Sequence, residues 1–351
     1  MSKKFKKDII YDYIKIFIEQ NKYNSINKIP SEPYLCSRFQ ASRETVRRAL
    51  EQLKEENIVF SVKGSGTYFK PVAIQNNIID NNCRYRIATI IQGQDKFANK
   101  LFIKGLREEI DNKNIELRIF YTDNKFSNER DCLKACVKGF DALVIDGVKA
   151  SLMNPNLDIY QKIEQKDIRV IFYNNYYPET NFPKVIIDDK KCAHLLVKQI
   201  VEEGHKDIAG IFFCDNYQGT QKYRGFIEAL NQYNIEIKDE NIKWIFSENL
   251  DDEKEFDRVI SKFLKKNRSS AIVCCNFMIL KHIQNKTKYP RKLACFDYSG
   301  DKWKEENILC SISPSFEVGK KVGKNILRML EDGNFKIHDY SYVFKPTIYY
   351  P

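Results

Sequence analysis

Hydrophobic residues follow two different patterns along this chain, and the pattern changes near residue 85. Before that point the apolar positions have helical spacing, both in residues 7–20 and at positions i, i+3, i+4 and i+7 of the stripe Val46, Ala49, Leu50 and Leu53. Beyond it, short apolar runs of strand length alternate with amphipathic stretches. The patterns therefore predict a small helical part followed by a larger α/β part.

Two serines mark the starts of predicted helices in the first part. Ser31 precedes a short helical stretch that carries Leu35 and Phe39, and Pro33 is tolerated in its first turn. Ser42 follows a tight turn and precedes the longer apolar stripe. Two capped helices separated by a tight turn predict a helix-turn-helix.

A β-hairpin is predicted directly after the second of these helices. The sequence IVFSVKGSGTYF holds two runs of β-branched and aromatic residues around Lys63, Gly64, Ser65 and Gly66. The glycines permit the positive φ angles that a tight hairpin turn requires. A hairpin in this place makes residues 1–70 an α+β winged helix-turn-helix head.

The chemistry of this head favours DNA as its partner. A recognition helix enters the major groove with its N-terminal turn, where Arg forks onto guanine and Ser or Thr reaches phosphates or bases. Residues 1–75 carry fourteen Lys or Arg against eight Asp or Glu, a net charge of +6 out of +11 for the whole chain. The alternative is an ordinary basic surface on a small helical domain. The predicted DNA contacts are Arg38, Ser42, Arg43, Thr45, Arg47, Lys63, Gly64, Ser65 and Gly66.

The first part resembles the DNA-binding domain of the GntR family of bacterial regulators. The resemblance lies in Pro-Ser-Glu at 30–32, Ser-Arg-Glu-Thr-Val-Arg at 42–47 and Gly-Ser-Gly-Thr at 64–67. The family usually carries an Arg that contacts DNA directly after Pro-Ser-Glu, and this chain has Pro33 there. The resemblance thus implies a DNA-binding head that lacks one of the family's contacts.

The second part has the alternation of strands and helices that is typical of parallel sheets. The strand candidates are RIATIIQ, IELRIFY, DALVID, RVIFY, KVIID, DIAGIFFC, SAIVCC and KLACF, with helices predicted at 98–113, 190–203 and 219–234. Such sheets are covered by helices on both faces, and ligands lie beyond the carboxyl ends of the strands. The length exceeds one doubly wound layer, which predicts two α/β sub-domains with a cleft between them. We expect a linker at residues 71–84 and a two-lobed effector-binding and dimerisation domain at residues 85–351.

Several classes of function are disfavoured by what the sequence lacks. No dinucleotide or nucleoside-triphosphate phosphate-binding motif and no nucleophile elbow follows any predicted strand, so neither an enzyme nor a cofactor is expected. The ten cysteines form no CxxC pair and the four histidines lie far apart, which disfavours a metal site and a disulfide framework. No apolar run is long enough for a membrane span, and the amino terminus has no signal-peptide pattern. A cytoplasmic protein is therefore expected.

The second part resembles the sugar-sensing domain of LacI-type repressors, which has the fold of the type I periplasmic binding proteins. The resemblance lies in Val-Ile-Ile-Asp-Asp at 185–189, Glu-Gly-His at 203–205, Arg-Gly-Phe at 224–226 and Phe-Asp at 296–297. A GntR-type head on this domain resembles the arabinose-responsive repressors. The resemblance implies two doubly wound sub-domains around a sugar site.

Polar residues at the predicted strand ends are the candidate effector contacts, because a sugar pocket needs carboxylates and amides for hydroxyl groups and aromatic faces for the ring. Tyr173, Tyr176, Tyr217 and Phe97 are possible stacking residues, with plain packing as the alternative for each. Lys222 stands where the family usually carries Arg, and Phe277 where it carries an Asp, so the effector need not be arabinose. The candidates are Asp146, Lys149, Asn174, Asn175, Asp189, Tyr217, Lys222, Asn276 and Asp297.

These observations predict a homodimeric transcriptional repressor that binds palindromic double-stranded operator DNA and is released by a small sugar in its cleft. One alternative keeps this architecture with another polar effector. A second is an enzyme-derived domain on a DNA-binding head, such as a pyridoxal-phosphate relative, and a third is a solute-binding protein without a role on DNA. The missing motifs and the basic head argue against the last two.

Overall fold

The fold is described from a computed structural model of the whole chain. The residues that it describes are 6–21, 29–56, 58–62, 66–69, 83–93, 97–111, 113–250, 252–284, 286, 291–298, 308–333 and 336–351. The chain forms two compact units that divide between Cys83 and Arg84. Residues 71–82 of the expected linker lie outside the described part, so the linker stays a prediction.

The first unit contains the predicted helix-turn-helix. Its helices are α1 (Lys6–Asn21), α2 (Glu32–Phe39) and α3 (Arg43–Glu55). Ser31 Oγ accepts a hydrogen bond from the backbone N–H of Tyr34 at 3.4 Å, and Ser42 Oγ accepts one from Thr45 at 3.2 Å. Both predicted caps are confirmed, and Pro33 lies in the first turn of α2.

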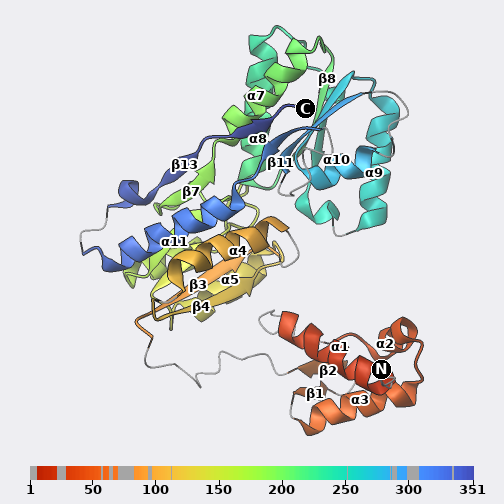
Figure 1. Ribbon diagram of the computed structural model, residues 1–351, viewed down its shortest axis with the longest axis vertical. Helices are drawn as coiled ribbons and strands as arrows, with labels where there is room; N and C mark the ends of the chain where they lie inside the picture. Colours follow the sequence, from red (N-terminus) through yellow and green to blue (C-terminus); the bar gives the residue numbers. More distant parts are fainter. Residues whose placement is uncertain are drawn as a thin grey trace. The chain divides into compact units, whose positions relative to one another are not determined.

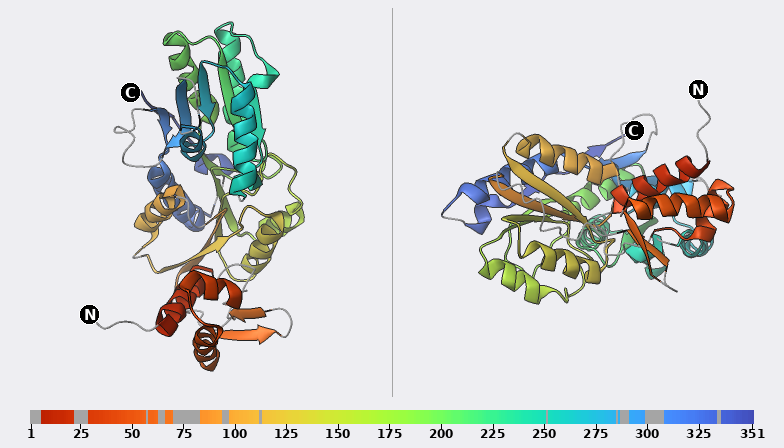
Figure 2. Two further views of the ribbon diagram at one scale, coloured as in Figure 1. Left: turned by 90° about the vertical axis from the view of Figure 1, so that its right-hand side faces the viewer. Right: turned by 90° about the horizontal axis from the view of Figure 1, so that it is seen from below.

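The core of this unit joins the two predicted amphipathic stripes. The four apolar residues of the α3 stripe are buried and belong to one cluster with Ile10 and Ile14 of α1. Strands β1 (Val59–Val62) and β2 (Gly66–Phe69) pair antiparallel, and Phe69 is buried in the same cluster. The winged helix is therefore confirmed, while its tip at 63–65 lies outside the described residues (Figures 1 and 2).

The second unit holds two six-stranded sheets, each the centre of one lobe. The first lobe has the strand order β13-β7-β6-β5-β3-β4 and the second β14-β12-β11-β10-β8-β9. The described pairings are parallel except that β14 runs antiparallel to β12. The strands are β3 (Tyr85–Ile91), β4 (Ile115–Tyr121), β5 (Ala142–Ile145), β6 (Arg169–Tyr173), β7 (Lys184–Ile187), β8 (Ile208–Phe213), β9 (Ile242–Ile245), β10 (Ala271–Cys274), β11 (Lys292–Tyr298), β12 (Leu309–Ile312), β13 (Tyr342–Phe344) and β14 (Thr347–Tyr349).

Helices cover both faces of each sheet, as the alternating pattern predicts. In the first lobe α4 and α11 lie side by side on one face, and α5 and α6 cover the other (Figures 1 and 2). In the second lobe α7 and α8 pack in one apolar cluster, and α9 and α10 in another. The helices are α4 (Phe97–Ile110), α5 (Phe126–Cys136), α6 (Leu157–Gln165), α7 (Asp189–Glu202), α8 (Tyr217–Gln232), α9 (Glu253–Lys266), α10 (Phe277–Gln284) and α11 (Ser315–Glu331).

Helices α4 and α11 approach each other closely enough to require glycine. A Cβ atom on Gly105 would lie 2.0 Å from the backbone oxygen of Phe316, and one on Gly319 would lie 2.1 Å from that of Phe102. The two helices, more than two hundred residues apart in the chain, thus meet backbone to backbone.

All eight predicted strands are present, and the structure adds β9, β12, β13 and β14. Cys132 and Cys136 are buried on α5. All ten cysteines are free thiols. Among the described residues, no group of His, Cys, Asp or Glu is arranged to hold a metal ion, and no helix has the length and apolarity to cross a membrane.

Candidate functional site

Three arginines lie on α3, and they differ in whether they form an ion pair within the described part of the head. Arg47 Nε lies 3.3 Å from Glu32 Oε2, and Arg48 Nε lies 3.0 Å from Glu44 Oε1. Arg43 is exposed and forms no hydrogen bond or ion pair within the described part of the chain. Its guanidinium is therefore available to a partner without breaking an existing contact.

The remaining head candidates have local roles. Ser42 Oγ and Thr45 Oγ1 lie 2.9 Å apart, so the cap and the first turn of α3 share one hydrogen-bonded pair. Arg38 Nη1 donates to Tyr34 Oη at 2.9 Å and its guanidinium lies 4.9 Å from the ring centroid of Tyr13. Gly66 has a φ of 128°, as the turn required. Lys63, Gly64 and Ser65 lie outside the described residues.

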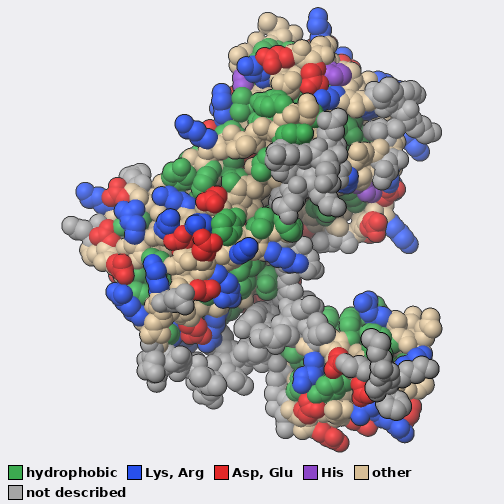
Figure 3. Space-filling view, in the orientation of Figure 1, with side chains coloured by type: hydrophobic (Ala, Val, Ile, Leu, Met, Phe, Trp, Pro, Cys, Tyr) green, Lys and Arg blue, Asp and Glu red, His purple; other side chains and the backbone are tan. Residues whose placement is uncertain are grey.

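Charge is mixed on the one face of the molecule that Figure 3 draws. On the face drawn in Figure 3, Lys and Arg side chains are interspersed with Asp and Glu on both units. Net charge alone therefore does not place a phosphate-binding surface, and the interpretation of the head depends on α3 itself.

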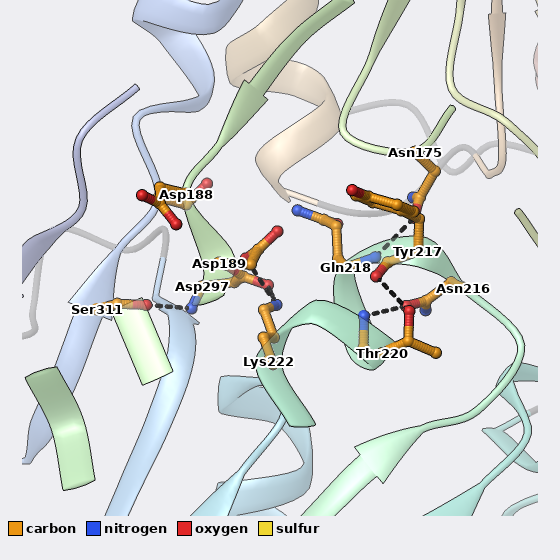
Figure 4. Close-up of polar contacts among 12 residues, drawn as sticks. Asn175, Asp188, Asp189, Asn216, Tyr217, Gln218, Thr220, Lys222, Asp297 and Ser311 are labelled. Atoms are coloured by element: carbon orange, nitrogen blue, oxygen red, sulfur yellow. Dashed lines mark hydrogen bonds and ion pairs between the residues drawn. The ribbon is translucent and has the colours of Figure 1, made fainter. Parts of the chain in front are cut away.

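The second unit brings together three candidates from distant places in the chain. Lys222 of α8 forms ion pairs with Asp297, at the end of β11, and with Asp189, at the start of α7, where Nζ and Oδ1 are 3.7 Å apart (Figure 4). The side chains of Lys222 and Asp189 are only 3% and 4% exposed. Ser311 Oγ accepts the backbone N–H of Asp297 at 3.0 Å. The Asp297 side chain is 29% exposed, so the ion triad is buried at Lys222 and Asp189 and partly open at the carboxyl end of β11.

Burial changes the proton affinity of this triad. It raises the pKa of Asp189 to about 7, although Lys222 opposes the shift. Burial alone would lower the pKa of Lys222, but Asp297 and Asp189 outweigh it and hold that pKa above its ordinary value. Lys222 therefore stays charged, and Asp189 gains or loses a proton near neutral pH.

A fourth candidate lies in the first lobe and is connected to the triad through amides. Asp146 is buried and accepts hydrogen bonds from Gln92 Nε2 at 3.4 Å and from Asn175 Nδ2 at 2.9 Å. Asn175 Oδ1 accepts the backbone N–H of Gln218 at 3.3 Å, and the Gln218 side chain is directed toward Asp189 (Figure 4). The hydrogen bonds run from one lobe to the other.

Tyr217 lies on the same inter-lobe boundary. Its hydroxyl accepts a hydrogen bond from Tyr176 at 2.7 Å, and burial raises its pKa. Lys184 Nζ lies 3.7 Å from the ring centroid of Tyr176, and burial lowers the pKa of this lysine. The two tyrosines thus connect the lobes beside a lysine.

The three remaining candidates, Lys149, Asn276 and Asn174, are not part of the triad or of its amide contacts. Lys149 has a φ of 42° and pairs with Glu248 of the second lobe. Asn276 Oδ1 accepts the backbone N–H of Ile279 at 2.9 Å, which is a helix cap for α10. Asn174 is half-buried with a φ of 54°.

One of the possible stacking residues is unsuited to a ring contact in the cleft. Tyr173 is fully buried, and its ring stacks on Phe102 with centroids 3.8 Å apart. The packing alternative is therefore correct for Tyr173. Phe97, by contrast, is 47% exposed at the start of α4.

Sequence reasoning missed Gln92 and Gln218. Gln92 directly follows strand β3, so the rule that polar strand-end residues line the cleft identifies it. Gln218 lies four residues before Lys222, one helical turn away on α8, and that spacing was the available signal.

Two family models match the chain. Residues 6–69 match the bacterial regulatory proteins of the gntR family. Residues 102–279, half of the chain, match the periplasmic binding proteins and sugar-binding domain of the LacI family.

Two relatives are arabinose metabolism transcriptional repressors. The protein from Halalkalibacterium halodurans is 29% identical over 76% of this chain and 72% of its own length. The protein from Geobacillus stearothermophilus is 27% identical over 90% of this chain and 88% of its own length.

Solved structures share the fold at low identity. The transcription regulator CcpA of Lactococcus lactis matches with a TM-score of 0.63 and 16% identity, covering 76% of this chain and 97% of that one. The regulator CelR in complex with cellobiose matches with a TM-score of 0.64 and 13% identity, covering 88% and 90%. These likenesses support the two-lobed fold.

Proposed function

Because this chain belongs to the family of the periplasmic binding proteins and LacI-type sugar-binding domains, and carries a head of the gntR family, we propose that it is a sugar-responsive transcriptional repressor. The head binds operator DNA, and the two-lobed unit binds the effector. The arabinose metabolism repressors among its relatives make arabinose the first effector to test.

The observation that carries the effector half is the ion triad of Lys222, Asp189 and Asp297, in which Lys222 and Asp189 are buried. A buried charged cluster is costly unless it is paired, and here it lies at the carboxyl ends of strands, where ligands of this fold bind. Carboxylates and amides at this edge suit the paired hydrogen bonds that sugar hydroxyls make. The proposed effector contacts are therefore this triad with Asp146, Asn175 and Gln218.

The DNA half rests on α3 and its cap. Arg43 and Arg47 occupy the turns of α3 that enter the major groove in helix-turn-helix proteins. We propose that two heads of a homodimer bind the two half-sites of a palindromic operator. Ligand binding would change the orientation of the two lobes, so that the heads no longer match the spacing of the half-sites. Such a repressor acts in the cytoplasm, where its operator is.

Selection from random duplex DNA with the full chain gives the operator, and gel shifts with that duplex then test release by L-arabinose and a panel of pentoses and hexoses. We expect a palindromic motif, a dimer in sedimentation, and loss of the shifted band with at least one sugar. Failure to enrich any motif contradicts the DNA half. A complex that no sugar in the panel disturbs contradicts the effector half.

A further inference from the structure

The first lobe holds one fully buried carboxylate, that of Glu129 on α5, and its two oxygens accept four hydrogen bonds. Oε2 accepts from Asn154 Nδ2 at 2.8 Å and from Asn156 Nδ2 at 2.9 Å. Oε1 accepts from the hydroxyls of Tyr160 at 3.1 Å and Tyr177 at 2.5 Å. Burial raises the pKa of both tyrosines well above its ordinary value, and the Glu129 charge raises it further, so both hydroxyls keep the protons that they donate. The carboxylate is thus a common acceptor for four side chains.

Three of these four donors belong to two segments of the first lobe, residues 147–156 and 174–177, which we call the boundary segments. The two asparagines lie in the first segment, and Tyr177 lies in the second. The Tyr177 hydroxyl also lies 2.9 Å from the backbone oxygen of Val148, in the first segment. Glu129 therefore holds both segments at one point.

Both boundary segments contact the second lobe. Ser151 of the first segment donates its hydroxyl to the backbone oxygen of Cys214 at 2.5 Å and its backbone N–H to that of Asp215 at 3.3 Å. In the second segment Asn175 Oδ1 accepts the backbone N–H of Gln218 (Figure 4). Each of these contacts lies within three residues of a donor to Glu129. The hydrogen bonds to the carboxylate thus lie directly behind the contacts between the lobes.

Regular secondary structure does not hold the boundary segments in place, because neither contains a helix or a strand. Lys149 of the first segment has a φ of 42°, a conformation that residues with a side chain adopt rarely and that needs support from its surroundings. The shape of these segments therefore depends on side-chain anchors, and Glu129 is the anchor that they share.

We propose that Glu129 is a positioning residue for the contact between the lobes: its hydrogen bonds hold the boundary segments where they meet the second lobe. Asp146 directly precedes the first segment and Asn175 lies in the second, so the same bonds position two of the proposed effector contacts. This last part rests on the proposed function, whereas the lobe contact itself needs no ligand. Loosened segments would leave fewer chains ready to bind, which weakens the apparent affinity for the effector.

Hydrogen exchange of the ligand-free full chain tests the inference. Glu129→Gln keeps the size of the side chain but replaces one accepting oxygen with an amide group that donates, and this group would face donors. We expect about tenfold faster exchange in peptides that cover Ser151 and Gln218, whose backbone N–H groups bond across the lobes. Unchanged exchange in both peptides overturns the inference.

Tyr160→Phe is the matched control. Tyr160 donates to the same carboxylate from α6, so this variant removes one hydrogen bond of the same kind without releasing a boundary segment. Measured against the buried strand β5, exchange at Ser151 and Gln218 is expected to match the wild-type chain. An acceleration equal to that of the Glu129 variant would make the cluster a general stabiliser of the lobe and would overturn the inference.

Tyr177→Phe decides the question if the Glu129 variant does not fold. It keeps the carboxylate and removes the donor that belongs to the second boundary segment. Exchange at Gln218 is expected to be faster in this variant than in Tyr160→Phe, although each loses one hydroxyl group. Equal exchange in the two tyrosine variants contradicts the proposal.

Sugar binding gives a second readout, by calorimetric titration with L-arabinose or with whichever sugar of the panel releases the operator. We expect about tenfold weaker binding to the Glu129→Gln variant and wild-type affinity in Tyr160→Phe. Equal affinity in the Glu129 variant and the wild-type chain overturns the part that concerns the effector. If no sugar of the panel binds the wild-type chain, the proposed function fails, and the exchange measurements still decide the role of Glu129 in the lobe contact.

Discussion

Lys149 and Glu248, which are 99 residues apart in the chain, form an ion pair that joins the two lobes. Beside it, Asn124 Nδ2 donates to Ser247 Oγ, and Ser151 Oγ donates to the backbone oxygen of Cys214 at 2.5 Å. Asn124 follows β4 and Ser247 follows β9. Strands β4 and β9 each form one edge of their sheet, and β13 and β14 form the opposite edges. The chain passes from one lobe to the other between β13 and β14. The lobes are thus connected at both edges of their sheets.

Removing this ion pair should loosen the lobe contact. Glu248→Gln leaves Lys149 without its partner, and the φ of 42° at Lys149 is a conformation that needs such support. The backbone N–H of Ser151 bonds to Asp215 of the other lobe at 3.3 Å, so hydrogen exchange of peptides covering residues 147–153 reports the contact. We expect faster exchange there in the variant.

Glu228→Gln is the control for this experiment. It removes the same charge from an exposed ion pair with Lys190 that lies wholly within the second lobe. Equal exchange in the Glu248 variant and the wild-type chain would mean that the ion pair does not hold the lobes together.

Replacing Arg43 should weaken operator binding. It is the α3 arginine that has no contact within the described part of the chain, so Arg43→Ala removes a DNA contact without disturbing the head. The expected loss is about 1–3 kcal/mol of binding free energy if Arg43 forks onto a base. Gel-shift titration measures it, with Arg258→Ala of α9 as the control, since Arg258 is exposed and pairs with Glu255. Full affinity in the Arg43 variant would exclude it as a contact.

Gly105→Ala should destabilise the first lobe. The added methyl group meets the backbone of Phe316, which cannot rotate away as a side chain does, so α4 and α11 must separate. Overpacking of this kind costs about 1–3 kcal/mol of unfolding free energy, measured by denaturant titration. Gly139→Ala is the control, because a Cβ there has no atom within 4 Å. Similar loss in both variants would mean that the close contact between α4 and α11 is not its cause.

Stability should depend on pH through Asp189. Its pKa is about 7 in the folded chain and 3.8 in a free side chain, so between these values the folded state binds more protons than the unfolded state. The free energy of unfolding therefore falls as pH rises from about 4 to about 7. Asp189→Asn should flatten this slope in thermal unfolding measured across that range.

The control is Asp158→Asn. The pKa of Asp158 is lowered by its hydrogen bond with Arg130, so its contribution is lost only as pH falls below about 4. A slope that persists in the Asp189 variant would assign the pH dependence to other groups.

The sequence predicted those features that depend on neighbours in the chain. Ser31 and Ser42 cap helices through backbone N–H groups three residues away, and the α3 stripe is a consequence of helical period. The eight apolar strands are long enough to carry a clear pattern. Strands β13 and β14 have three residues each, and such short segments are defined by the partner strand rather than by their own period.

The candidate site was predicted in part, because the position of a residue at the end of a strand is also a property of the local sequence. The rule that polar residues follow strand ends selected Asp146, Asn175, Asp189 and Asp297, which lie near the boundary between the two lobes. The same rule also selected Asn276, whose side chain caps α10 instead. It also did not distinguish Tyr173, whose side chain points into the core.

Only the tertiary structure decided which charges meet. Lys222 and Asp297 are 75 residues apart, and two parallel crossovers lie between them, so no local spacing relates the two. Their pairing and burial depend on the order of strands in the second-lobe sheet, as the contact between Lys149 and Glu248 depends on how the two lobes meet. Periodicity and capping are properties of a segment, whereas ion pairing and proton affinity are properties of the folded environment, because they depend on which distant groups exclude water together.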